Sequence, residues 1–176
     1  MAVFVCLLRA IGPATHALMS MAALRQRCEQ AGLQDVVTHG NTGNVICRSE
    51  RSVAEVRETV QRVVDSFGIR SEVFVRTPLQ MLAVVRADPF PEAARDRPAE
   101  VGVWSFHRTP PWPERIRNFE GPQRIATIGA HLVLDYPQSI SGSRLDVEKL
   151  VGARMTMRNW RVFATLADKA AALQKG

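Results

Sequence analysis

The sequence predicts an α+β fold whose first half is a ferredoxin-like βαββαβ subdomain and whose second half adds another antiparallel sheet with helices. Two observations carry this prediction. Short β-favouring apolar runs alternate with segments of helical periodicity, and capping residues and glycines mark the boundaries between them. A length of 176 residues and an apolar fraction of 46% suit two small subdomains within one compact unit.

The first half contains four predicted strands and two predicted helices. Ser20 caps the first helix, and Ser52 with Glu55 forms a capping box at the start of the second. A hairpin between the two helices reverses at Gly43, because glycine accepts the positive φ of a tight turn. The predicted strands cover residues 3–8, 36–40, 45–48 and 72–76, and the predicted helices cover residues 21–31 and 53–67.

A connecting segment precedes the second half. Thr77 followed by Pro78 opens a helix that extends to Ala87. Three prolines and alternating charges over residues 89–98 indicate a solvated connection without regular structure. The division of the chain is therefore a ferredoxin-like subdomain over 1–76, a connecting helix and linker over 77–98, and a second α+β subdomain over 99–176.

The second half is a degenerate echo of the first, without enough identity for a sequence repeat. Its last two strands turn at Gly129, and two helices close the chain. Ser143 with Asp146 caps the first of these helices, and Thr156 begins the last one. The predicted strands cover residues 101–106, 124–128 and 131–136, and the predicted helices cover residues 144–151 and 156–171.

Composition excludes several classes of protein. The formal net charge is +6, and nearly all of the 23 cations are arginines, which bind phosphate or carboxylate in a planar fork. Cys6, Cys28 and Cys47 form an odd set without C-x-x-C spacing, which argues against a disulfide framework and a zinc site. The four histidines are widely spaced, so we expect no metal and no cofactor. No export signal or membrane span is evident, and we expect a cytoplasmic protein.

Five short motifs resemble the bacterial domain of unknown function 1697 family. They are Leu7-Leu8-Arg9, Met21-Ala22-Ala23-Leu24-Arg25, Thr42-Gly43-Asn44-Val45, Asp88-Pro89-Phe90, and Thr156 with Arg158-Asn159-Trp160. The resemblance implies a two-part α+β fold and no established activity. The chain departs from the family pattern in the loop after Arg9, where Gly12 and Pro13 replace a glycine-rich stretch. Because Pro13 offers no backbone N–H, an anion has fewer donors in this loop.

The candidate ligand site combines two predicted helix starts near the C-terminus. If Thr156 is an N-cap, the helix dipole and Arg158 favour a phosphate or carboxylate there. In the alternative interpretation, the helix is simply capped and Trp160 packs in the core. Arg9 ends a central strand, where open sheets often place functional groups. The candidate ligand-binding residues are Arg9, Asn44, Ser141, Ser143, Arg144, Thr156, Arg158 and Asn159.

Three function classes follow from these residues. The first is a noncatalytic binding module for a small anion or a polyanion. The second is a small enzyme with a site near Arg9 and Arg158, which ranks lower because the sequence lacks an activated nucleophile, a catalytic base and a metal cage. The third is a homo-oligomer, with a homodimer formed through an exposed sheet edge. Nucleic acid is not a favoured partner, because the aromatic residues alternate as in packed strands.

Overall fold

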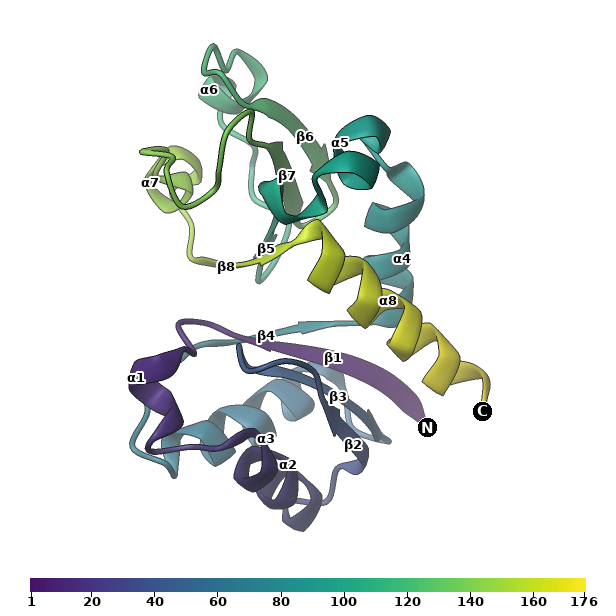
Figure 1. Ribbon diagram of the computed structural model, residues 1–176. Helices are drawn as coiled ribbons and strands as arrows, with labels where there is room; N and C mark the ends of the chain where they lie inside the picture. The colour runs from purple at the N-terminus through teal and green to yellow at the C-terminus, as the bar shows by residue number, and fades with distance from the viewer. The chain divides into compact units, whose positions relative to one another are not determined.

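The computed structural model describes residues 1–176 and contains two four-stranded antiparallel sheets with helices (Figure 1). This confirms the predicted α+β class. The chain divides into two compact units, one made of Met1–Leu79 with Leu166–Gly176 and the other of Gln80–Thr165. Each unit holds one sheet, and the last helix begins in the second unit and ends in the first. The predicted division at residues 76 and 99 stays a prediction.

The first unit has the predicted βαββαβ order. Its sheet has the strand order β2-β3-β1-β4, and every pair in it is antiparallel. The bounds are β1 (Ala2–Leu8), α2 (Met21–Gln30), β2 (Gln34–Thr38), β3 (Asn44–Ser49), α3 (Val53–Asp65) and β4 (Val73–Arg76). A single turn of helix, α1 (Pro13–His16), lies in the segment predicted to be a loop, because the Thr15 hydroxyl and the Gly12 backbone bond each other at 2.9 and 3.1 Å.

Side-chain caps determine where the two long helices of this unit begin. Ser20 accepts a hydrogen bond from the backbone N–H of Ala23 at 3.1 Å, and Ser52 with Glu55 forms the predicted capping box. One face of α3 carries the apolar stripe, which packs on alternate side chains of β1. The three cysteines are free and buried in this core, and burial is the main reason that the pKa of Cys28 rises to about 12.

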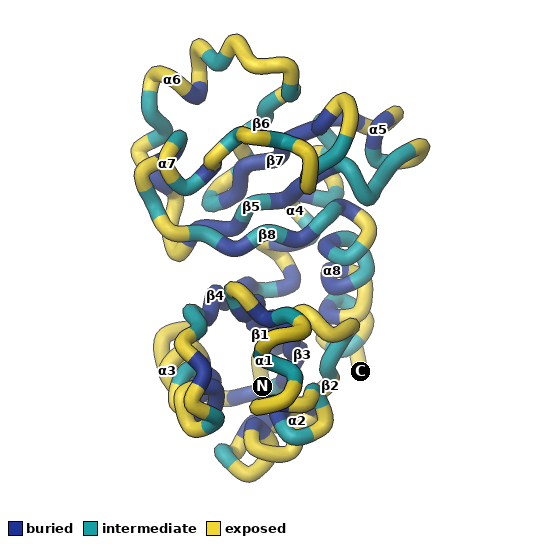
Figure 2. Tube along the Cα trace, turned by 60° about the vertical axis from the view of Figure 1, so that its left-hand side comes forward, coloured by how far each residue is buried: buried dark blue, intermediate teal, exposed yellow.

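The second sheet repeats the strand order of the first. Its order is β6-β7-β5-β8, so each strand has a counterpart in the order β2-β3-β1-β4. The second half, predicted to be a degenerate echo of the first, therefore repeats its strand topology but has much shorter helices. The bounds are β5 (Val101–Phe106), α6 (Glu114–Arg117), β6 (Arg124–Ile128), β7 (His131–Asp135), α7 (Val147–Val151) and β8 (Met155–Asn159). In Figure 2, β5 and β7 are largely buried, whereas the connections around α6 and α7 are mostly exposed.

The connection between the sheets is more ordered than predicted. The helix α4 (Pro78–Ala87) was expected, but residues 89–98 also contain α5 (Pro91–Asp96), and the 3-10 turn η1 (Pro98–Glu100) follows. The buried carboxylate of Asp135 pairs with Arg97 at 2.6 Å and with Arg124 at 2.6 Å. Arg124 also pairs with Glu92 and lies over the ring of Phe90, 4.7 Å from its centroid. This network attaches the connection to the second sheet, so a solvated connection was the wrong expectation.

The prediction that Thr156 begins the last helix is wrong. Thr156 lies in β8, opposite Ser105 of β5, and the helix α8 (Trp160–Lys175) begins four residues later. Asn159 is the actual cap, since its side-chain oxygen accepts the backbone N–H of Val162 at 3.0 Å. The physical reason is that a strand partner supplies the backbone hydrogen bonds that a helical turn would otherwise supply.

The predicted cap of the preceding helix is also displaced. Ser143 does not begin it. The N-cap of α7 is Asp146, whose carboxylate accepts the backbone N–H of Lys149 at 3.0 Å, and Gly152 ends the helix at a φ of 77°. Ser143 is therefore free to take part in the loop that precedes α7.

The C-terminal half of α8 belongs to the first unit and is attached to its sheet by polar contacts. The backbone N–H of Val3 donates to the side-chain oxygen of Gln174 at 3.2 Å, and Arg48 donates to the carbonyl of Leu173. The ammonium of Lys169 lies 3.1 Å from Nδ1 of His39 and donates to it when the ring is neutral.

The contact between Lys169 and His39 makes a pH-dependent contribution to stability. Partial burial, followed by the charge of Lys169, lowers the pKa of His39 in the folded protein. The unfolded chain keeps the ordinary value near ~6.5 and so binds the proton first on acidification. Stability is therefore expected to fall as the pH drops below about 6.5, with a loss of about 1 °C in the unfolding midpoint because the pair is partly exposed.

The measurement is thermal unfolding of the wild type and of His39→Gln between pH 7.5 and pH 5. The variant should lose less stability than the wild type over this range, since glutamine does not titrate. An equal pH dependence in both proteins would show that His39 does not contribute.

Candidate functional site

The candidate site is a pocket at one end of the second sheet. The antiparallel pairing of β6 and β7 places Arg124 opposite Asp135, so the segment that enters β6 lies beside the segment that leaves β7. Residues 119–123 follow α6 and residues 136–145 precede α7, and these two helices lie close together in Figure 1. The two segments enclose a pocket of about 460 Å³, a size that suits a small molecule.

Two serine hydroxyls lie in the wall formed by the segment after β7. Ser139 accepts the backbone N–H of Gly142 at 2.9 Å. Ser143 accepts the backbone N–H of Leu145 at 3.2 Å and the side-chain amide of Gln123 at 3.2 Å. A hydroxyl that accepts from the protein keeps its own proton, so both serines have a donor left for an acceptor in the pocket.

Arg144 is the only charged side chain that lines this pocket. It is exposed and forms no ion pair with a carboxylate. The lining contains no aspartate or glutamate, so the local charge favours an anion. The lining also contains no histidine and no cysteine.

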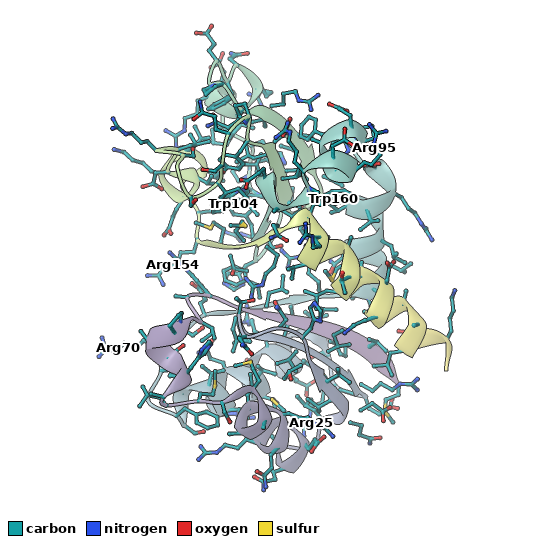
Figure 3. All side chains as sticks on the ribbon, viewed as in Figure 1. Arg25, Arg70, Arg95, Trp104, Arg154 and Trp160 are labelled. Atoms are coloured by element: carbon teal, nitrogen blue, oxygen red, sulfur yellow. The ribbon has the colours of Figure 1, made fainter.

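The floor of the pocket is apolar. Tyr136 lines it while remaining 1% exposed, and burial raises the pKa of its phenol to about 12, so the group stays neutral at physiological pH. Trp104 of β5, labelled in Figure 3, packs against the same apolar cluster. Phe119 forms part of the opposite wall and packs directly on Gly121, where an added Cβ would lie 2.5 Å from Cε1 of the phenylalanine.

Glu100 holds the segment after β7 in place. Its carbonyl accepts the backbone N–H of Tyr136 at 3.0 Å, and its carboxylate accepts the backbone N–H of Ile140 at 2.7 Å. The guanidinium of Arg97 donates to the carbonyl of Tyr136. These bonds hold the backbone at both ends of residues 136–140, the segment that carries Ser139.

The structure brings together only part of the predicted site. Ser143 and Arg144 line the pocket, and Ser141 is exposed on the same loop. Thr156 and Arg158 are buried in β8, where the guanidinium donates to the Thr156 hydroxyl at 3.0 Å and burial lowers the pKa of Arg158 to about 10. No helix starts at Thr156, so the predicted helix N-terminus that would attract an anion there is absent, and ligand binding by Thr156 and Arg158 stays a prediction.

Three further predicted residues have structural contacts of their own. Asn159 caps α8. Arg9 and Asn44 belong to the first unit, whereas the pocket belongs to the second. Asn44 is buried and donates to the carbonyl of His39 at 2.8 Å, which shapes the hairpin, and Arg9 lies 3.9 Å from the carboxylate of Glu72. Ligand contacts for these residues, and an enzyme site near Arg9 and Arg158, stay predictions.

Sequence reasoning missed the aromatic and amide side of the pocket, namely Phe119, Gln123, Tyr136 and Ser139. The sequence does contain one indication of this side of the pocket. The hairpin that turns at Gly129 was predicted, and its register alone places residue 123 near residue 136. The packing of a ring on Gly121 has no signature in the sequence.

No three or more histidine, cysteine, aspartate or glutamate side chains are grouped so as to hold a metal ion. None of the helices has the length together with the apolar character that crossing a membrane requires.

Comparison with known proteins places the chain in a family and supports the fold. No curated protein is similar enough in sequence to match it. The solved structure of the conserved bacterial protein SP0830 from Streptococcus pneumoniae matches with a TM-score of 0.73 and 16% identity, over 97% of this chain and 99% of that chain. At this identity the likeness speaks for the fold alone. The family model described as protein of unknown function (DUF1697) matches residues 1–130, and the chain therefore belongs to the DUF1697 family.

Proposed function

We propose that the protein is a noncatalytic binding module for a small anionic ligand, which it binds in the pocket of the second unit. The observation that carries the proposal is the donor set of Ser139, Ser143 and Arg144. Both hydroxyls already accept hydrogen bonds from the protein, and the guanidinium has no carboxylate partner. These three groups offer protons, which suits a phosphate or a carboxylate.

Charge and preorganisation support the same conclusion. A single cation without a nearby carboxylate attracts an anion without competition from an internal pair. The loop that carries the two hydroxyls is fixed by Glu100 through the backbone of Tyr136 and Ile140. Binding therefore costs little ordering of the protein, which leaves more of the interaction energy for affinity.

The test is an NMR titration of the full chain with inorganic phosphate and with acetate, monitored at the backbone amides of the loop 139–145. We expect chemical-shift changes to concentrate there, and we expect Arg144→Ala to weaken binding by roughly tenfold, the usual effect of losing a charge-assisted hydrogen bond. Arg57→Ala is the matched control, because Arg57 is an exposed arginine on α3 of the first unit and its loss should leave affinity unchanged. The proposal fails if neither anion perturbs the loop or if both variants bind equally.

A further inference from the structure

We infer that the ligand of this pocket carries a planar aromatic ring, so that the site takes an aryl phosphate or an aryl carboxylate. This inference rests on the proposed function, which concerns only the anionic group. An anionic group alone would contact only the hydrogen-bond donors of the pocket. The shape and chemistry of the remaining lining therefore indicate what the rest of the ligand is.

The size of the pocket argues for more than an inorganic anion. A phosphate ion is far smaller than a volume of about 460 Å³, which lies within the range of roughly 300–1,000 Å³ that holds drug-sized ligands. An isolated phosphate would leave the apolar wall in contact with water. A ligand with an apolar body would remove that wall from water and gain the corresponding hydrophobic free energy.

The apolar wall offers a ligand one aromatic ring, that of the half-buried Phe119, because Tyr136 is only 1% exposed. Pro122, Pro137 and Leu145 complete this wall with saturated side chains. Aromatic rings pair favourably in offset-stacked and edge-to-face geometries beyond the gain from buried area. A planar ring in the ligand therefore matches this wall better than a flexible chain or a saturated ring of the same size.

The position of Phe119 is fixed by its neighbour. The ring packs on the backbone of Gly121 so closely that an added Cβ would meet both Cζ and Cε1, and it would lie 3.0 Å from Oε1 of Gln123. Gln123 in turn donates to Ser143 at 3.2 Å, which joins the aromatic wall to the hydroxyl wall. A ligand that spans both walls is therefore an amphipathic molecule with a ring at one end and a single anionic group at the other.

The experiment compares four probes by isothermal titration on the full chain: phenyl phosphate, cyclohexyl phosphate, benzoate and inorganic phosphate. We expect phenyl phosphate to bind at least about tenfold more tightly than inorganic phosphate, because it buries the ring. We also expect it to bind roughly fivefold more tightly than cyclohexyl phosphate, because only a planar ring pairs with the aromatic wall. Benzoate distinguishes a carboxylate site from a phosphate site.

Variants separate the two walls. Phe119→Leu keeps the wall apolar and should abolish the preference for phenyl over cyclohexyl phosphate, which is measured as the ratio of the two affinities in the same variant. Equal affinities of the wild type for phenyl and cyclohexyl phosphate would overturn the inference without any variant. If inorganic phosphate binds as tightly as phenyl phosphate, the aromatic ligand is excluded and the proposed function survives. If none of the four probes binds, the proposed function itself fails.

Discussion

Gly43→Ala is expected to destabilise the first unit by about 3 kcal/mol, which combines left-handed backbone strain with overpacking. Gly43 has a φ of 73°, and an added Cβ would lie 2.7 Å from Cβ of Leu8 and 2.8 Å from Cγ1 of Ile11. Leu8 is fully buried, and its backbone N–H donates to the carbonyl of Gly43 at 2.8 Å, so neither chain segment can move away without losing a bond. Chemical denaturation measures the effect as a difference in the free energy of unfolding, with one m-value used for both proteins.

Gly40→Ala is the matched control for this prediction. Gly40 lies in the same hairpin with a φ of 62°, but an added Cβ meets nothing within 4 Å. It should therefore cost only the backbone strain, about 1 kcal/mol. Equal losses for the two variants would show that the close approach to Leu8 and Ile11 contributes nothing.

Asp135→Ala is expected to destabilise the second unit by about 2–3 kcal/mol, because it removes the carboxylate that two arginines share. The carboxylate is 4% exposed, whereas Arg97 and Arg124 are 37% and 49% exposed. The arginines can thus recover some hydration, which keeps the loss below that of a fully buried pair. Thermal unfolding measures the loss, and faster hydrogen exchange at the amides of α5 would show that its attachment weakens, since Arg124 connects Asp135 to Glu92.

Asp96→Ala serves as the comparison for Asp135. Its ion pair with the adjacent Arg95 has a similar distance of 2.7 Å, but both side chains are more than half exposed. Exposed pairs contribute little, so the expected loss is much smaller than that of Asp135→Ala and close to the error of the measurement. A loss at Asp96 as large as that at Asp135 would contradict the role assigned to burial.

Sequence reasoning succeeded where the determining interactions are local. The caps at Ser20 and Ser52 and the reversal at Gly43 each depend on neighbours within a few residues, and all three are confirmed. It failed for β8, where Thr156, Arg158 and Asn159 are residues that also suit a helix start. The pairing of Thr156 with Ser105, some fifty positions earlier in the chain, decides the outcome, and such a contact has no local signal.

The site shows the same division between local and distant information. Ser143 and Arg144 could be predicted as ligand-binding residues because hydroxyl, glycine and arginine residues cluster in one turn of the sequence. Their partners across the pocket come from the segment before β6, and only the register of the hairpin connects the two. The wrong helix start at Thr156 led to the selection of Thr156 and Arg158, which the structure places in β8 as buried residues.

The sequence order of the two units has a consequence for synthesis on the ribosome. The unit built from Gln80–Thr165 is contiguous, so all of its residues are synthesised before Leu166–Gly176. The other unit begins with Met1 but needs Leu166–Gly176, whose contacts reach Val3 and Arg48. The half of the protein that is translated first therefore cannot complete its native contacts until the whole of the second unit has been synthesised.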